Sequence, residues 1–212
     1  MDADCDRPHE WSRTMSGKGE RTRQRIIDKA LQIFSVKGYF NTSISDLLEV
    51  TGLTKGGLYC HFKSKEDIWY AVYDEAVARW RQAVFKNVHG IRDPLDRISH
   101  IVDRALGDYL GGDLFDGGCF FVNMMVELSD QSSSMSRHIL RGFVDFSRLF
   151  QMWLSEASQR GIIPSDAAQR EVADFIVVAL NGAATLYVSS RDSTVLEETR
   201  NQLQFYINCL RE

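Results

Sequence analysis

The chain has 212 residues, of which 44% are hydrophobic and 11% aromatic, and its formal net charge is −4. This composition supports one or two folded domains and excludes disordered, collagen-like and low-complexity classes. The most apolar stretch, residues 175–188, contains Asn181 and is shorter than the roughly 20 residues that a bilayer span needs. The first nineteen residues lack the apolar run of a signal peptide. We therefore expect a soluble cytoplasmic protein with no membrane partner.

Charge is distributed unevenly along the chain. Residues 12–65 hold ten Lys and Arg against four Asp and Glu, a net charge of +6, whereas residues 66–212 hold fourteen against twenty-one, a net charge of −7. Such a basic segment indicates contact with a polyanion, although a solvated face gives the same bias. The four cysteines lie far apart without a CxxC pair, so we expect free thiols, no metal site and no cofactor.

Helical periodicity dominates the chain, and no segment alternates like a strand. We therefore expect an all-α fold of about nine helices. Local signals set several ends: Gly38 and Gly52 suit helix C-termini, Ser43 and Asp46 form a capping box, and Asp93 caps a helix. The expected helices cover residues 22–36, a short segment around 44–48, and residues 54–61, 65–88, 94–110, 119–128, 136–159, 164–188 and 195–210.

The most informative segment runs from residue 42 to residue 67. Two short helices meet at a tight turn at Gly52, and we expect Leu47, Leu48, Leu53 and Leu58 to be buried and to hold the angle between them. This is the pattern of a helix-turn-helix, whose second helix can enter a DNA major groove. Gly56 and Gly57 leave that helix without bulk, so its backbone can approach DNA closely. Donors at Thr54, Lys55, Tyr59 and His61 surround the gap.

This segment resembles the DNA-binding domain of the TetR/AcrR family of bacterial transcriptional regulators. The resemblance covers residues 20–66 and is most specific in the run Gly52-Leu53-Thr54-Lys55-Gly56-Gly57-Leu58-Tyr59-x-His61-Phe62, followed by Ser64-Lys65-Glu66. Leu48 and Thr51 depart from the family pattern at positions that are usually alanine. The resemblance implies DNA contacts by Thr42, Thr54, Lys55, Gly56, Tyr59, His61 and Lys65. The alternative is a helical hairpin in which Tyr59 and Phe62 only fill a core.

The resemblance also implies three parts of the chain: a flexible arm over residues 1–19, a three-helix DNA-binding domain over 20–65, and an effector-binding and dimerisation domain over 66–212. Small residues on one helix and an apolar stripe on the last helix suggest a four-helix dimer interface, although the same stripe can pack internally. The expected interface residues are Ala179, Gly182, Ala183, Leu203, Tyr206 and Ile207. A homodimer fits a palindromic double-stranded operator.

A small hydrophobic or aromatic effector is expected to bind among aromatic side chains of the acidic part, although aromatic residues at helical spacing often form plain core. The expected lining residues are Trp69, Tyr73, Tyr109, Phe120, Met124, Phe146, Phe150 and Trp153. The leading interpretation is a repressor that such an effector releases from DNA. An enzyme is not expected, because the chain lacks a nucleophile–base pair, a phosphate loop and a metal constellation.

Cys119 supports an alternative function, a redox or electrophile sensor. It follows Gly117-Gly118 at the start of a predicted helix, where the helix dipole lowers the pKa of a thiol. The sequence around it is similar to a subgroup of the family that senses electrophiles through such a cysteine. Between this role and that of a small buried apolar residue, we favour the buried residue.

Overall fold

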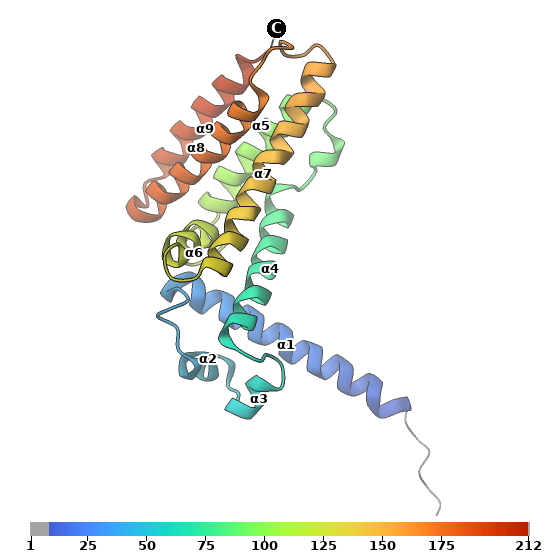
Figure 1. Cartoon of the computed structure of the whole chain (residues 1–212), viewed down its shortest axis with the longest axis vertical. Coiled ribbons are helices and arrows are strands. Elements are labelled where there is room, and N and C mark those ends of the chain that lie inside the picture. Colours follow the sequence, from blue (N-terminus) through green and yellow to red (C-terminus); the bar gives the residue numbers. More distant parts are fainter. Residues whose placement is uncertain (1–8, 212) are drawn as a thin grey trace, which may run out of the picture. The chain divides into compact units, whose positions relative to one another are not determined.

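The computed structural model describes residues 9–211, and these residues are helical with no strand among them (Figure 1). The all-α prediction is confirmed. The α-helices are α1 His9–Lys37, α2 Ile44–Thr51, α3 Lys55–Tyr59, α4 Lys65–Val84, α5 Pro94–Arg104, α6 Phe120–Leu128, α7 Ser133–Gln159, α8 Gln169–Ser190 and α9 Ser193–Asn208. A 3₁₀ turn, η1, spans Val88–Gly90, and a π-helix, η2, spans Ala105–Gly111. By packing, the chain divides within α4 into two compact units, with Ala76 ending the first and Val77 beginning the second.

The first unit is built on the C-terminal half of α1. Ile26, Ala30 and Phe34 are completely buried, because they recur at four-residue spacing and share one helix face. Leu47 from α2 and Leu58 from α3 complete this core. The helix begins at His9, earlier than the predicted residue 22, so it includes part of the expected arm. Residues 1–8 of that arm lie outside the described residues.

Short-range chemistry sets the helix ends of this unit as predicted. Gly38 and Gly52 have φ values of 81° and 67°, in the left-handed region that glycine adopts without strain. The Ser43 side chain accepts a hydrogen bond from the backbone N–H of Asp46, and the Asp46 carboxylate accepts one from the backbone N–H of Ser43. The Ser43 hydroxyl also donates to the Asp46 carboxylate, and this bond, the bond from the Ser43 backbone N–H and the bond from Lys37 hold the pKa of Asp46 far below its ordinary value. The Asp46 side chain of the capping box is therefore a charged carboxylate.

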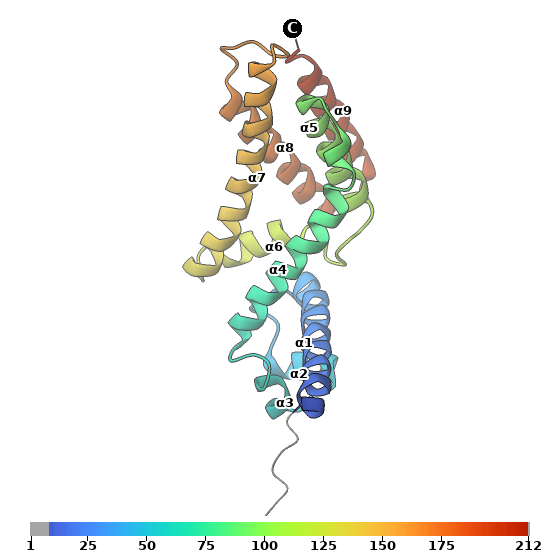
Figure 2. The same ribbon diagram turned by 90° about the vertical axis from the view of Figure 1, so that its right-hand side faces the viewer.

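In the second unit α5, α7, α8 and α9 run alongside one another (Figures 1 and 2). Ile98, Phe150, Ile176 and Ile207 are fully buried, one from each helix. Several boundaries differ from the sequence expectation: α4 ends at Val84 and not at residue 88, and α7 begins at Ser133 and not at residue 136. The end of the predicted fifth helix is wound as the π-helix η2, and α8 begins at Gln169 because the preceding residues form a turn closed by the Ala167 N–H and the Pro164 carbonyl.

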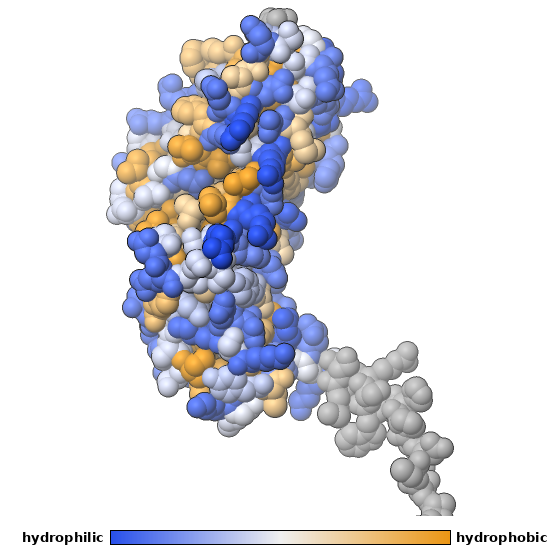
Figure 3. All heavy atoms as spheres, in the orientation of Figure 1, coloured by the Kyte–Doolittle hydropathy of each residue, from blue (hydrophilic) through white to orange (hydrophobic). Residues whose placement is uncertain are grey.

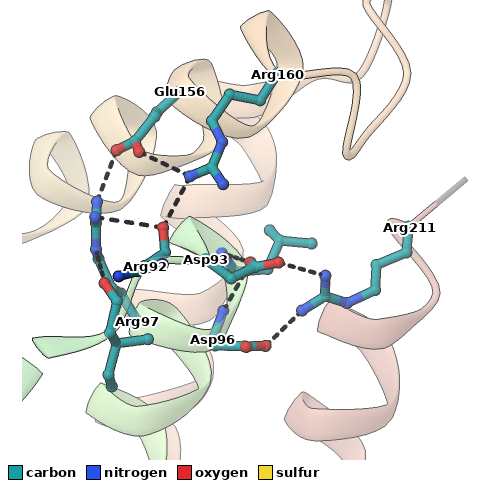
Figure 4. Close-up of polar contacts among 9 residues, drawn as sticks. Arg92, Asp93, Asp96, Arg97, Glu156, Arg160 and Arg211 are labelled. Atoms are coloured by element: carbon teal, nitrogen blue, oxygen red, sulfur yellow. Dashed lines mark hydrogen bonds and ion pairs between the residues drawn. The ribbon is translucent and has the colours of Figure 1, made fainter.

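Charged side chains join the ends of α5, α7 and α9 (Figure 4). Glu156 accepts hydrogen bonds from Arg97 at 2.7 Å and from Arg160 at 3.1 Å. Arg211, just after α9, contacts Asp93 at the start of α5 at 2.9 Å. Burial by itself raises the pKa of Asp93, but the bonds from Arg211 and from backbone N–H groups outweigh it and hold the pKa below its ordinary value. The network therefore fixes three helix ends together.

The α8 helix is long and apolar enough, by length and composition alone, to cross a membrane. Of its most apolar eighteen-residue window, 44% is buried inside the structure. One such helix is weak evidence for a span, because core helices of soluble proteins have the same composition.

Candidate nucleic-acid interface

The α3 helix presents a bare, polar outer surface. Leu58, 1% exposed, anchors it to the core, whereas Lys55 and Gly56 are exposed and Tyr59 is 41% exposed. An added Cβ at Gly56 would meet no atom within 4 Å. The Thr54 hydroxyl caps the helix by accepting a hydrogen bond from the Gly57 N–H at 3.2 Å. Because Leu58 anchors one side of α3 and the opposite side is exposed, the exposed side can approach another macromolecule closely.

The turn before α3 is held by the backbone. The Gly52 N–H donates to the carbonyls of Leu48 and Glu49. Two predicted core residues, Leu48 and Leu53, are only half-buried. This corrects the expectation that all four leucines are buried, because α2 turns Leu47 and Thr51 toward the core and Leu53 lies in the turn after it. Thr51 is buried instead, and its hydroxyl donates to the Leu47 carbonyl at 2.6 Å.

Two predicted phosphate contacts have their side chains engaged inside the first unit. Thr42 is completely buried, and its hydroxyl donates to the Gly38 carbonyl at 2.6 Å. Lys65 donates through Nζ to the carbonyls of Tyr39 and Thr42, at 2.8 Å each, and lies 4.1 Å from the centre of the Tyr39 ring. Their contacts with phosphates stay a prediction, and within the first unit both side chains have a structural role. They hold the segment between α1 and α2 in place.

The remaining predicted residues lie around the end of α3. His61 is half-buried, and its backbone N–H donates to the Leu58 carbonyl. Phe62 is buried in the core, and the Arg23 guanidinium lies 5.0 Å from the centre of its ring. Exposed Lys63 follows directly. The sequence analysis did not single out Lys63, although its charge next to the motif was a usable signal.

Family comparisons agree with this arrangement. The family described as "Bacterial regulatory proteins, tetR family" matches residues 26–72, and the "Tetracyclin repressor-like, C-terminal domain" matches residues 94–203. The chain belongs to the TetR family of transcriptional regulators. Members of this family that it resembles are regulators rather than enzymes.

Individual relatives cover most of the chain. The transcriptional repressor DhaR of Mycobacterium sp. (strain GP1) is 27% identical over 176 residues, which are 83% of this chain and 87% of DhaR. A TetR regulator from Chloroflexus aurantiacus is 29% identical, with a TM-score of 0.83 over 90% of this chain and 96% of its own. A cysteine mutant of the TetR-family regulator CifR, in complex with 26-base-pair operator DNA, has a TM-score of 0.73 at 18% identity, over 85% of this chain and 94% of its own.

The predicted effector-lining residues come from both units. Trp69 and Tyr73 are buried in the first unit, where their rings stack at 5.5 Å. The other six are in the second unit, and five of these are aromatic rings that belong to one cluster. Trp80, which was not among the predicted lining residues, connects the cluster, because its ring lies 6.1 Å from Phe121 and 5.0 Å from Phe146. The cluster rings are Tyr109, Phe115, Phe120, Phe121, Trp80, Phe85, Phe146, Phe150 and Trp153.

Cys119 lies at the N-cap of α6 as expected, and it is the buried residue that the sequence analysis favoured over a reactive thiol. The side chain is buried, and the Tyr109 hydroxyl donates a hydrogen bond to its Sγ at 3.2 Å. Burial raises the pKa of the thiol, and the hydrogen bonds from Tyr109 and from two backbone N–H groups do not offset it. The low thiol pKa that the sensor alternative requires is therefore not found, because desolvation exceeds the effect of the helix terminus.

An apolar face covers α8 and α9 (Figure 3). Phe175, Val178 and Leu186 on α8 are 51%, 67% and 60% exposed, and Phe205 on α9 is 67% exposed. A shallow groove of about 510 Å³ lies between the two helices. Its lining residues are Phe175, Ala179, Glu198, Thr199, Gln202, Leu203, Phe205 and Tyr206.

The predicted interface residues divide between the two sides of these helices. Gly182 is exposed, and Ala179 and Tyr206 are half-buried on the groove. Three others, Ala183, Leu203 and Ile207, are 3%, 2% and 0% exposed within the unit itself. Their place in a dimer interface stays a prediction, and of the three only Leu203 lines the groove. Both α8 and α9 carry apolar residues on two sides. The sequence alone therefore does not show which side packs inside the unit and which side is exposed.

Proposed function

We propose that the protein is a cytoplasmic homodimeric repressor that binds a palindromic operator through α3 and is released by a small hydrophobic effector. Residues 20–65 bind DNA, and residues 66–212 bind the effector and dimerise. The observation that carries the proposal is the exposed Gly56 with Lys55 and Tyr59 beside it, on a helix that Leu58 anchors from behind.

The chemistry of α3 suits a major groove. Gly56 allows the helix backbone to approach the base edges, and Lys55 supplies a cation with three donors. Tyr59 and His61 offer donors to phosphates, which fix the orientation of the helix on the duplex. The Thr54 cap keeps the first turn of α3 folded while it is exposed to solvent. The operator complex of CifR supports this use of the fold in DNA binding.

The apolar face of α8 and α9 supports dimerisation with a second copy. Exposed large side chains such as Phe175 and Phe205 are costly in water and favour association. A twofold axis through this face makes a four-helix interface, and it places two α3 helices for two half-sites of a palindrome.

The aromatic cluster of the second unit supports an apolar effector. A ligand that enters it has to separate packed rings such as Trp80, Phe146 and Phe150, so it binds a second conformation better than the first. If that conformation has lower DNA affinity, the effector releases the operator, and by linkage the operator weakens effector binding equally. Sensing through Cys119 has no such support, because its thiol is buried and its pKa is raised.

DNA binding by α3 is tested by fluorescence anisotropy with duplexes that the wild-type protein selects from a random pool. Lys55→Ala is expected to weaken binding by about 1–3 kcal/mol. Lys86→Ala is the matched control, because Lys86 is an exposed lysine of the second unit, and it is expected to bind as the wild type does. Equal binding by both variants would show that Lys55 of α3 does not contact DNA. If the wild-type protein selects no duplex, the proposed function is overturned.

Dimerisation is tested with Phe205→Glu, examined by analytical ultracentrifugation. A charge at this exposed position leaves the folded unit intact but places two carboxylates in the proposed interface, so a monomer is expected. Val126→Glu is the control, because Val126 is 68% exposed on α6 and is not among the residues that line the groove. A Phe205→Glu variant that remains a dimer would place the interface elsewhere.

A further inference from the structure

The ion pair between Asp113 and Arg191 joins two unusual backbone positions of the second unit. Both residues have left-handed conformations, with φ values of 46° and 55°, which a residue with a Cβ keeps only where the surrounding structure holds it there. Nη1 of Arg191 lies 3.2 Å from Oδ1 of Asp113. Asp113 lies just after η2, and Arg191 is the C-cap of α8. The pair therefore ties the chain between η2 and α6 to the end of α8.

The chain between η2 and α6, which we call the 112–118 segment, packs against α8. Its last residue, Gly118, has a φ of 88°, and the Val188 side chain of α8 fills the space that a Cβ would occupy. The Gly118 N–H donates to the Phe115 carbonyl and closes a turn. Asn123 of α6 donates through Nδ2 to the Gly117 carbonyl at 2.9 Å. Packing and single hydrogen bonds therefore hold this segment, so it can move while the neighbouring helices stay folded.

Phe115 places a ring of the 112–118 segment inside the aromatic cluster. The side chain is 4% exposed, and its ring centre lies 5.8 Å from the ring centres of Tyr109 and Phe120 and 6.3 Å from that of Phe121. These three neighbours belong to η2 and α6, whose own hydrogen bonds fix them. Outward movement of the segment would therefore withdraw one ring and leave a space of about that size between η2 and α6.

The contacts that close the 112–118 segment are weak enough to break transiently. The side chains of Asp113 and Arg191 are 57% and 48% exposed, and an exposed ion pair of this kind is screened by salt and contributes little. The preceding element, η2, is a π-helix, a rare conformation that is frequent at functional sites. The segment therefore combines a buried ring, a strained backbone and a weak tie to α8.

We propose that the 112–118 segment is a gate through which a small apolar effector reaches the aromatic cluster. The Asp113–Arg191 pair holds the gate closed, and Phe115 occupies the position that an apolar group of the effector takes when the gate opens. This inference rests on the proposed function and adds to it an entry route and a binding position. A neutral aromatic molecule fits that position, because it restores the ring contacts that Phe115 gives up.

Cys119 reports on the gate, because it directly follows the 112–118 segment. Its thiol is buried and bonded to the Tyr109 hydroxyl, so a reagent reaches it when the segment moves or when the second unit unfolds. The test measures how fast N-phenylmaleimide, a neutral aromatic thiol reagent, labels Cys119 in the native full-length protein without DNA, by peptide mass mapping. Exposed Cys60 of the first unit is the internal reference.

Two variants remove the ion pair from opposite sides. Asp113→Asn and Arg191→Gln are each expected to raise the labelling rate of Cys119 about two- to fivefold relative to Cys60. They change the charge near the thiol in opposite directions, so a rise in both reports movement of the segment and not ionisation of the thiol. The double variant is expected to match the single variants, because all three break the same pair.

Two controls keep the pair intact. Asp116→Asn removes the same charge from an exposed residue of the same segment, and Glu156→Gln removes ion pairs with Arg97 and Arg160 outside the segment. Both are expected to keep the wild-type labelling rate, and a rise with Glu156→Gln would indicate labelling through unfolding of the second unit.

A wild-type rate in both ion-pair variants, or an equal rise in either control, would overturn the inference. Neither result affects DNA binding by α3, which Lys55→Ala tests separately. If the wild-type protein selects no duplex, the proposed function fails, whatever the labelling rates are.

Discussion

Lys65 offers a sharp test of how the first unit is built. Its ammonium group donates to two backbone carbonyls, those of Tyr39 and Thr42, and lies over the Tyr39 ring. The Lys65→Met substitution keeps the aliphatic stem but removes all three interactions. Hydrogen bonds from a charged donor contribute about 1.5–3 kcal/mol each, and a cation–π contact at an exposed site contributes about 0.5–1 kcal/mol.

These contributions are not additive, because the three interactions share one ammonium group and water replaces part of them. We therefore expect Lys65→Met to lower the free energy of unfolding by about 2–4 kcal/mol. The measurement is urea unfolding followed by the fluorescence of Trp69, which is buried in the first unit. The matched control is Lys63→Met, because Lys63 is exposed two residues away, and it is expected to change stability by less than about 0.5 kcal/mol.

The two interpretations of Lys65 give opposite results. If Lys65 is a phosphate contact, as the family resemblance implies, then Lys65→Met leaves stability unchanged and reduces the salt slope of DNA binding by about 1. A loss of stability confirms the role in positioning the segment between α1 and α2. Wild-type stability in the variant would refute the reasoning.

Three further predictions concern the second unit. Gly118→Ala is expected to lower the free energy of unfolding by about 1–3 kcal/mol in thermal unfolding, because Gly118 has a φ of 88° and an added Cβ would overlap the Cγ2 methyl group of Val188. In native protein at pH 7, Cys119 is expected to react with a maleimide far more slowly than exposed Cys60, as peptide mass mapping would measure, because its thiol is buried with a raised pKa. Arg211→Met is expected to cost about 1 kcal/mol at neutral pH, and its difference from the wild type should shrink as the pH falls below about 4. This follows because the pKa of Asp93 is depressed in the folded state, so its stabilisation is present above the ordinary carboxyl pKa and is lost as the group is protonated.

A specific result would contradict each of these predictions. Gly90→Ala is the control for the glycine substitution, because its added Cβ meets no atom within 4 Å, and equal melting temperatures for the two variants would refute the steric argument. Equal labelling rates at Cys119 and Cys60 would show that the site around Cys119 opens readily. A stability difference for Arg211→Met that stays constant down to pH 2 would exclude Asp93 as the titrating partner.

Local chemistry made much of the first unit predictable. Glycine at positions 38 and 52, and the pair Ser43 and Asp46, specify helix ends through conformations and hydrogen bonds that involve neighbouring residues only. The exposed side of α3 was predictable for the same reason, because its five residues leave one apolar anchor, Leu58, and place the rest outward.

Long-range packing determines the features that could not be predicted from the sequence. Lys65 bonds to the Tyr39 carbonyl across 26 positions of the chain, and no local pattern encodes that contact. The outer side of α8 could not be told from its inner side, because both carry apolar residues, so buried Ala183 was predicted in place of exposed Phe175. The helix position of Cys119 alone indicated a low pKa, and the burial that raises the pKa depends on side chains from other elements.

The central claim is that α3 reads DNA sequence, and the most direct measurement is a selection of duplexes from a random pool by the wild type and by Lys55→Ala in parallel. The account predicts that the wild type enriches a palindrome and that the variant enriches the same palindrome with one or two positions relaxed symmetrically in each half-site. Enrichment of the same motif by both proteins, with no position relaxed in the variant, would contradict base contact by Lys55. Enrichment of no motif by the wild type would contradict sequence-specific DNA binding altogether.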